Sequence, residues 1–198
     1  MNRTKFLLTG KLKLPFRDRI VKETLFVTGG CRSGKSRFAL NFADRRFKRK
    51  IFVATCQARD QEMRRRIKEH QKARGRDWQT VEVLTALSET VASHSSQADV
   101  ILIDCLTLWV SNLLAENTSQ EEILTCADAL TQAINQAPCS VILVSNEVGT
   151  GIVPENELAR RFRDVAGLVN QKVAACANRV VWMVAGIPVP IKGMLTDD

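Results

Sequence analysis

The chain has 198 residues, of which 45% are hydrophobic, and a formal net charge of +8 at pH 7. A chain of this length forms one domain with a sizeable core, and no apolar run reaches the ~18 residues that a membrane-spanning helix needs. The six cysteines include no C-x-x-C pair, which argues against a zinc site and favours reduced thiols in the cytoplasm.

Much of the positive charge lies at the start of the chain. Residues 1–22 carry seven basic residues against a single acid, Asp18, and two further basic clusters follow at 45–50 and 64–66. Solvated surface with affinity for phosphate is the simplest interpretation. A nucleic-acid surface is the alternative, but the chain has no tyrosine and few aromatics interleaved with the basic residues, so bases would have little to stack on. We predict a basic extension over residues 1–22 and one compact domain over residues 23–198.

The first half of the compact domain alternates between strand and helix patterns. The apolar run 25–27 predicts a strand, and residues 37–43, where apolar side chains recur at helical spacing, predict a helix. Residues 50–56 predict a second strand that is buried on both faces. The next stretch, 58–76, is strongly charged, but Met63, Ile67 and His70 share one face of a helix.

The second half of the chain continues this alternation. It contains four further predicted strands, at 78–83, 98–104, 140–145 and 179–185. Its predicted helices cover 87–95, 119–135 and 156–177, and the apolar segment 106–114 is expected to pack on the sheet. Continuous apolar strands that alternate with helices predict an α/β fold, a mostly parallel sheet with helices on both faces. In such folds the active site lies at the carboxyl ends of the strands.

Residues 29–36, Gly-Gly-Cys-Arg-Ser-Gly-Lys-Ser, match the phosphate-binding loop pattern G-x-x-x-x-G-K-[ST]. They lie between a predicted strand and a predicted helix, as the pattern requires. Glycines let the backbone approach a phosphate, while the loop N–H groups and the helix N-terminus present positive charge. Lys35 adds a full charge near the β- and γ-phosphates, and Ser36 offers a hydroxyl ligand for Mg²⁺. A chance glycine-rich turn is the alternative interpretation.

Two other residues have side chains suited to chemistry on a nucleotide. Asp104 ends an apolar strand, which is the Walker B arrangement that helps to hold Mg²⁺ beside a phosphate loop; a helix-capping Asp is the alternative. His70 is one of two histidines, and a lone histidine on a helix face is more often structural than catalytic. Lys68, Lys72 and Arg74 would hold phosphates near His70, however, and an imidazole there can attack phosphorus as a nucleophile. The loop 146–156 follows a strand directly and is interpreted as a binding loop, as a capped turn into the next helix, or as both together.

Together these motifs resemble the bifunctional adenosylcobinamide kinase/adenosylcobinamide-phosphate guanylyltransferases of cobalamin synthesis, the CobU/CobP type. The resemblance runs from about Thr24 to Lys192. The residues that carry it are 28–36, 54–55, 66–74 with Trp78, 103–113, 145–149, 151–156, 159–164 and 167–171. It implies a P-loop NTPase with a RecA-like sheet, assembled as a homotrimer with sites between subunits. The chain departs from the family pattern at Cys31, where alanine is frequent, and at Glu69-His70, where some members have two adjacent histidines.

The resemblance also implies two reactions. The hydroxyl of adenosylcobinamide takes a phosphoryl group from ATP or GTP, and GTP then gives its GMP unit, through an enzyme histidine, to form adenosylcobinamide-GDP. The guanylylated histidine of the family falls on His70, and Lys35 is the second catalytic residue. Mg²⁺ is expected at Ser36 and Asp104. The implied nucleotide contacts are Gly29, Gly30, Cys31, Arg32, Ser33, Gly34, Lys35, Ser36, Ala54, Thr55, Cys56, Arg74, Glu82 and Asp104.

Two other classes of function are consistent with parts of this pattern. The net charge and the RecA-like pattern also fit a nucleic-acid-dependent P-loop ATPase, whose hydrolysis would be stimulated by nucleic acid and would depend steeply on salt. A regulatory nucleotide-binding module without turnover would bind GTP but form no covalent adduct. The kinase/guanylyltransferase interpretation predicts adenosylcobinamide and GTP or ATP as partners, with no nucleic acid and no stable membrane insertion.

Overall fold

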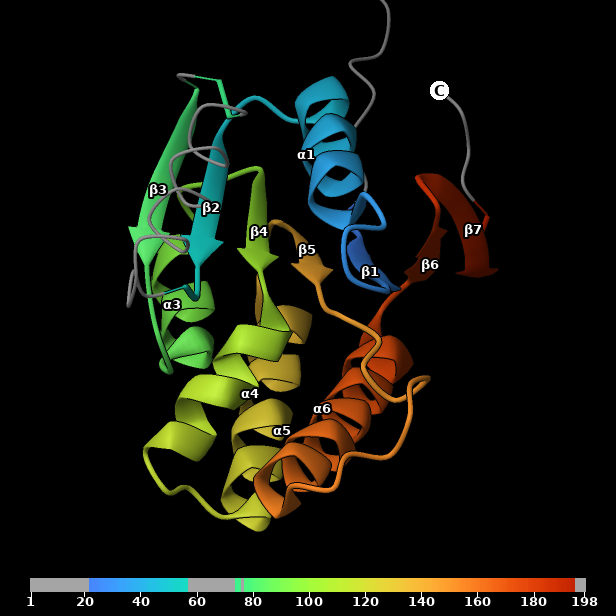
Figure 1. The fold of residues 1–198 in the computed structure, drawn as a ribbon. Helices are drawn as coiled ribbons and strands as arrows, with labels where there is room; N and C mark the ends of the chain where they lie inside the picture. The colour runs from blue at the N-terminus through green and yellow to red at the C-terminus, as the bar shows by residue number, and fades with distance from the viewer. Residues whose placement is uncertain (1–21, 57–73, 76, 195–198) are drawn as a thin grey trace, which may run out of the picture.

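The computed structural model describes residues 22–56, 74–75 and 77–194. The predicted extension, apart from Lys22, lies outside the described residues, and so does the segment 57–73, which contains His70. Within the described ranges the chain forms one seven-stranded sheet with helices on both of its faces (Figure 1). None of the described helices is both long and apolar enough to cross a membrane.

The predicted strands and helices within these ranges are confirmed, with ends that differ by a few residues. The elements are β1 Thr24–Gly29, α1 Lys35–Arg46, β2 Lys50–Ala54, β3 Trp78–Glu82, α3 Leu87–His94, β4 Val100–Asp104, α4 Leu106–Ala115, α5 Gln120–Gln136, β5 Ser140–Val144, α6 Glu157–Cys176, β6 Arg179–Val184 and β7 Ile187–Lys192. The apolar segment 106–114, for which the sequence predicts only packing on the sheet, is the helix α4.

The sheet has the strand order β3-β2-β4-β5-β1-β6-β7. Every pairing from β3 to β6 is parallel, and only β6 and β7 pair antiparallel. In this register the last residue of β2, Ala54, lies beside Asp104 of β4, which in turn lies beside Val144 of β5. The carboxyl ends of the parallel strands therefore meet at one edge of the sheet, and the segments that follow them share that edge.

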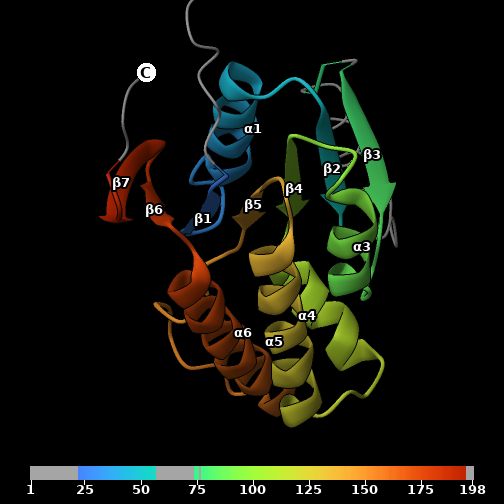
Figure 2. The same ribbon diagram turned by 180° about the vertical axis from the view of Figure 1, so that it is seen from behind.

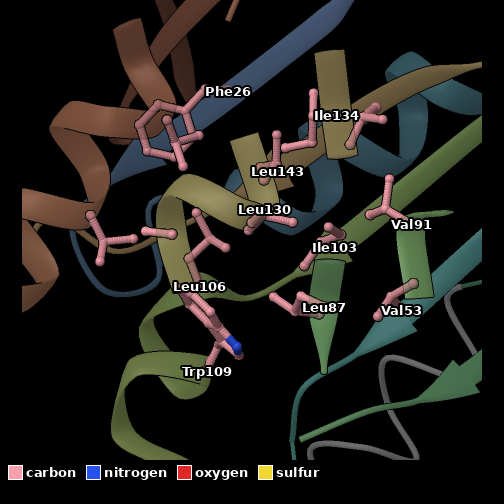
Figure 3. Packing of buried hydrophobic residues seen from close by; sticks show 14 of the residues in the cluster. Phe26, Val53, Leu87, Val91, Ile103, Leu106, Trp109, Leu130, Ile134 and Leu143 are labelled. Carbon is pink, nitrogen blue, oxygen red and sulfur yellow. The ribbon is translucent and has the colours of Figure 1, made fainter. Parts of the chain in front are cut away.

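Alternation along the strands divides the core into two layers. Side chains of successive strand residues point to opposite faces, so Leu25 and Val27 pack with α1 on one face, whereas Phe26 packs on the other. The larger cluster, beneath α3, α4, α5 and α6, contains Ile103 and Trp109 (Figures 2 and 3). Both side chains are almost fully buried, so they belong to the packed core between the sheet and these helices.

The strand β7 is an element that the sequence analysis does not predict. Pro188 and Pro190 lack the N–H groups that a central strand would need, but β7 is at the edge of the sheet and pairs only with β6. Its exposed face carries Ile187, Val189 and Ile191. Trp182 and Val184 of β6 pair with β7 and are exposed as well, so this edge presents an apolar surface.

Ser119 caps α5, as the sequence predicts. Its hydroxyl accepts a hydrogen bond from the Glu122 N–H at 3.2 Å, and the Glu122 carboxylate accepts one from the Ser119 N–H at 2.8 Å. We expect Ser119→Ala to lower the free energy of unfolding by about 1 kcal/mol, measured by urea denaturation. Ser93→Ala is the control, because the Ser93 hydroxyl bonds a carbonyl within α3 and caps nothing. Equal losses in the two variants would contradict the capping role.

Candidate functional site

The predicted phosphate-binding loop connects β1 to α1 and has the backbone geometry that its glycines allow. Gly29 has φ +147°, and a Cβ at this position would lie 2.4 Å from the carbonyl oxygen of Met183 in β6. Gly34, the residue before α1, has φ +94°. Arg32 is a non-glycine residue in the left-handed region, with φ 55°, which is typical of functional loops held by their surroundings. Gly30, Cys31 and Arg32 are exposed, whereas Ser33 is buried.

Lys35, the first residue of α1, folds back into this loop. Its side chain is 7% exposed, and its Nζ donates a hydrogen bond to the Gly30 carbonyl at 2.7 Å. Burial lowers the pKa of Lys35, and the negative charge of Asp104 partly offsets that effect. A cation that is largely removed from water interacts strongly with an anion placed beside it, so this amine is suited to bind phosphate.

Three further charged residues belong to this region: Asp104 and Glu82 at the carboxyl ends of β4 and β3, and Arg74, which precedes β3 in the chain. Asp104 is half-buried at the end of β4, and Glu82 is exposed at the end of β3. The Arg74 guanidinium lies 3.7 Å from the centroid of the Phe52 ring. Burial lowers the pKa of Arg74, and the charges of Asp104 and Glu82 oppose this. The Nη1 atom of Arg74 is buried and makes no hydrogen bond to any residue that the structure describes, which leaves a donor for an anion.

The three residues at the end of β2 have different environments. Ala54 and Cys56 are half-buried, while Thr55 is completely buried. The Thr55 hydroxyl accepts a hydrogen bond from the Cys105 N–H and donates one to the Cys105 carbonyl, both at 2.8 Å. This hydroxyl is engaged within the protein, so a nucleotide contact at this position would involve other atoms.

The loop after β5 is fastened directly to the phosphate-binding loop. The Glu147 N–H donates to the Gly29 carbonyl at 3.0 Å. Next to it, the Asn146 N–H donates to the Thr107 hydroxyl at 2.7 Å, and the Asn170 side-chain amide donates to the Asn146 carbonyl at 3.2 Å. The start of this loop is therefore fixed beside the phosphate-binding loop, which favours its interpretation as part of the site.

Ser36 and Asp104 are the predicted Mg²⁺ ligands. Ser36 is half-buried in the first turn of α1, and Asp104 is half-buried at the end of β4, with only β5 between β4 and β1. The charge of Asp104 acts on Lys35 of the phosphate-binding loop, so the carboxylate and the loop are close. A hydroxyl and a carboxylate beside bound phosphates are the oxygen donors that Mg²⁺ prefers. The residues present therefore fit this ion.

The two histidines differ in what the structure shows of them. His70 lies outside the described residues. His94 ends α3, and its Nδ1 is 3.0 Å from the Thr90 carbonyl and 2.9 Å from the Ser93 hydroxyl, all within its own helix. The sequence analysis assigns His94 no role, and nothing in its surroundings gives it one.

The sequence analysis assigns no role to three buried polar residues that the structure connects to the site: Thr107, Asn112 and Asn170. Asn112 bonds the Thr55 and Leu84 carbonyls. A buried amide inside the otherwise apolar run 106–114 is a local signal for such a role, because an amide is rarely buried without partners. The identity of those partners depends on the fold.

Most of the chain matches a family model and named bacterial relatives. The family model for cobinamide kinase / cobinamide phosphate guanyltransferase matches residues 25–191. The bifunctional adenosylcobalamin biosynthesis protein CobP of Pseudomonas aeruginosa is 43% identical over 167 residues, which cover 84% of this chain and 96% of that protein. The bifunctional adenosylcobalamin biosynthesis protein CobU of Escherichia coli is 41% identical over 180 residues, covering 85% of this chain and 99% of that protein.

Solved structures show a shared fold at low sequence identity. A structure from Pyrococcus horikoshii has a TM-score of 0.54 at 10% identity and covers 87% of both chains. An ATPase from the type III secretion system of pathogenic bacteria has a TM-score of 0.53 at 10% identity, covering 82% of this chain and 52% of that one. Identities this low show the fold alone. Together with the family match, they confirm the predicted α/β fold of a P-loop NTPase.

Two cysteines near the phosphate-binding loop should differ in reactivity. Cys31 is exposed in the loop, whereas Cys105 is buried, and burial is the main cause that raises the pKa of its thiol to about 12. The thiolate is the reactive form, and at pH 8 a thiol with that pKa is ionised in roughly one molecule in ten thousand. We expect iodoacetamide at pH 8 to modify Cys31 and to spare Cys105, as measured by peptide mass spectrometry.

The same experiment tests the location of the nucleotide. GTP should slow the modification of Cys31 but not that of Cys176, which lies at the end of α6. Equal slowing at both cysteines, or no protection of Cys31 at saturating GTP, would place the nucleotide elsewhere.

Proposed function

The chain belongs to the cobinamide kinase / cobinamide phosphate guanyltransferase family, and on this basis we propose that it is a bifunctional enzyme of adenosylcobalamin biosynthesis. It phosphorylates adenosylcobinamide and then converts the product to adenosylcobinamide-GDP. The structural observation that most supports this proposal is the buried Lys35 inside the phosphate-binding loop, electrostatically coupled to Asp104 at the same edge of the sheet. Residues 23–198 form the catalytic domain, which works in the cytoplasm.

The first reaction is a phosphoryl transfer. The hydroxyl oxygen of the aminopropanol arm attacks the γ-phosphorus of ATP or GTP, the bond from this phosphorus to the bridging oxygen breaks, and the nucleoside diphosphate leaves. The hydroxyl proton is released. Lys35 and the N–H groups of residues 29–36 offset the negative charge on the phosphoryl oxygens, which is the main requirement of this chemistry. Mg²⁺, held by Ser36 and Asp104, supplies further charge neutralisation when it is bound.

The second reaction proceeds through a covalent intermediate on His70. An unprotonated ring nitrogen attacks the α-phosphorus of GTP and expels pyrophosphate, leaving GMP on the histidine. A phosphate oxygen of adenosylcobinamide phosphate then attacks the same phosphorus, and the histidine leaves. Arg74 has an unpaired donor among the described residues and is placed to bind the phosphates, while Glu82 accepts hydrogen bonds from the nucleotide.

The remaining nucleotide contacts are proposed from the family resemblance and the positions of the residues. The loop residues Gly29, Gly30, Cys31, Arg32, Ser33 and Gly34 surround the phosphates. Ala54, Thr55 and Cys56 lie at the end of β2, beside Asp104. A loop that begins at Asn146 is fixed against Gly29 and is a suitable wall for the second substrate.

The nucleophile is tested by the intact mass of the protein after incubation with GTP and Mg²⁺. We expect a GMP adduct on the wild-type chain and on His94→Ala, and none on His70→Ala, because His70 is the proposed nucleophile, whereas the His94 ring, among the described residues, bonds only within its own helix. GTP binding is measured in parallel by calorimetry.

The alternative classes of function predict different results in this experiment or in an assay of GTP and ATP hydrolysis with added nucleic acid. GTP binding without any adduct would indicate a regulatory module or a kinase-only enzyme. Hydrolysis stimulated by nucleic acid would indicate an ATPase. An adduct that persists in His70→Ala would place the nucleophile at another residue.

We further propose a homotrimer. Its support is the apolar surface of β6 and β7, where Trp182, Ile187 and Ile191 are 41%, 65% and 61% exposed. Surfaces of this kind are frequently covered by a partner.

Sedimentation equilibrium should give about three times the 22.1 kDa of one chain. The double variant Ile187→Asp, Ile191→Asp should dissociate, because the charges would be buried in the interface. Gln97→Asp, which alters an exposed residue distant from β7 in the sequence, should leave the mass of the assembly unchanged. A trimer that survives the double variant would exclude this surface.

A further inference from the structure

One threonine fixes the backbone around Asp104. The Thr55 N–H donates to the Asp104 carbonyl at 3.3 Å, and the Thr55 hydroxyl accepts from the Cys105 N–H and donates to the Cys105 carbonyl. Thr55 thus bonds both residues on either side of the Asp104–Cys105 peptide. Its side chain is completely buried, so water does not compete for these bonds.

One asparagine fixes Thr55 in turn. Asn112 is 8% exposed, and its side-chain amide donates to the Thr55 carbonyl at 2.9 Å and to the Leu84 carbonyl at 3.1 Å. These carbonyls lie just beyond β2 and β3, where the strand ladders have ended. Both N–H groups of the amide are therefore used to hold the two strand ends together.

The helix α4 connects these bonds to the end of β4. It begins at Leu106, directly after Asp104 and Cys105, and its Trp109 donates from Nε1 to the Thr85 carbonyl at 2.7 Å. Two side chains of α4, Trp109 and Asn112, therefore bond the segments that follow β2 and β3. The helix itself begins just after β4. Three strand ends are held by one short helix.

We propose that Thr55 and Asn112 are positioning residues that set the Asp104 carboxylate for the metal–nucleotide complex. The proposal rests on the proposed function, which places Mg²⁺ at Asp104. Residues that orient a metal ligand through hydrogen bonds strongly affect metal affinity, typically by 10- to 100-fold. Thr55 also begins the connection from β2 to residue 74 that contains His70, so the same bonds fix the point from which that connection leaves the sheet.

This positioning role is an alternative to a direct contact between the Thr55 side chain and the nucleotide. A hydroxyl offers one donor and two acceptor positions, and the Thr55 hydroxyl already donates once and accepts once within a fully buried site. A ligand would have to break one of these bonds to reach it. Orientation of Asp104 requires no such rearrangement.

The experiment measures Mn²⁺ binding to the GTP complex by electron paramagnetic resonance, together with kcat and KM for the kinase step. We expect Thr55→Val to weaken Mn²⁺ binding about tenfold and to lower kcat at least tenfold, with KM for the corrinoid unchanged. Thr55→Ser keeps the hydroxyl and should stay within twofold of the wild type. Asn112→Leu should weaken Mn²⁺ binding severalfold, because it acts through Thr55.

Thr90→Val is the matched control. Thr90 is also buried, and its hydroxyl also donates to a backbone carbonyl, that of Ala86 at 2.6 Å, but within α3. It should lose stability without losing Mn²⁺ affinity. Thr55→Val with wild-type Mn²⁺ affinity, or Thr90→Val with an equal loss, would overturn the positioning role. If Thr55→Val does not fold, Thr55→Ala removes the same bonds without added apolar bulk and is measured instead.

The two proposals fail in different ways. A wild-type chain that binds GTP and Mn²⁺ but transfers no phosphoryl group contradicts the proposed function. The comparison of Mn²⁺ affinities among Thr55→Val, Thr55→Ser and Thr90→Val still tests the positioning role in that case, because it needs no turnover.

Discussion

The parallel register of β1, β2, β4 and β5 is the constraint on which the site depends. Because the strands run in one direction and end in register, Gly29, Ala54, Asp104 and Val144 come to a common edge. The pairing of the strand backbones alone therefore brings together residues that are far apart in the sequence. The two apolar layers that cover the faces leave this edge as the place where polar groups gather.

Electrostatics at this edge favours anions. Lys35 and Arg74 are both partly removed from water, and burial lowers the pKa of each, while the charge of Asp104 acts on both in the opposite sense. Cations held in this way lose hydration in the folded protein rather than when the ligand binds. Fixed charges of this kind are worth more than solvated ones, because they need no reorganisation when phosphate arrives.

The sequence predicts those parts of the structure whose signals are local. The apolar strands, the Ser119 cap and the phosphate-binding loop each occupy one short stretch, and the structure confirms the strands and the cap. The strand β7 is not predicted from the sequence, because Pro188 and Pro190 argue against a strand unless that strand is known to lie at the edge of a sheet. The hydrogen bonds of Thr55 are not predicted either, since their partner Cys105 is fifty residues away along the chain. Only the pairing of β2 with β4 brings the two residues together.

The helix α4 shows why such bonds are retained in an apolar core. The run 106–114 would bury well with leucine at every inward position, yet it keeps Thr107 and Asn112, both of which are buried. Each bonds a segment that leaves the sheet: Asn112 holds those after β2 and β3, and Thr107 holds the one after β5. Burying a polar group is costly unless its bonds are made, so these residues stabilise only the arrangement in which all three segments are in place. Apolar replacements at Asn112 would fill the same space but would leave the Thr55 and Leu84 carbonyls without these donors, so the segments after the strands would no longer be fixed.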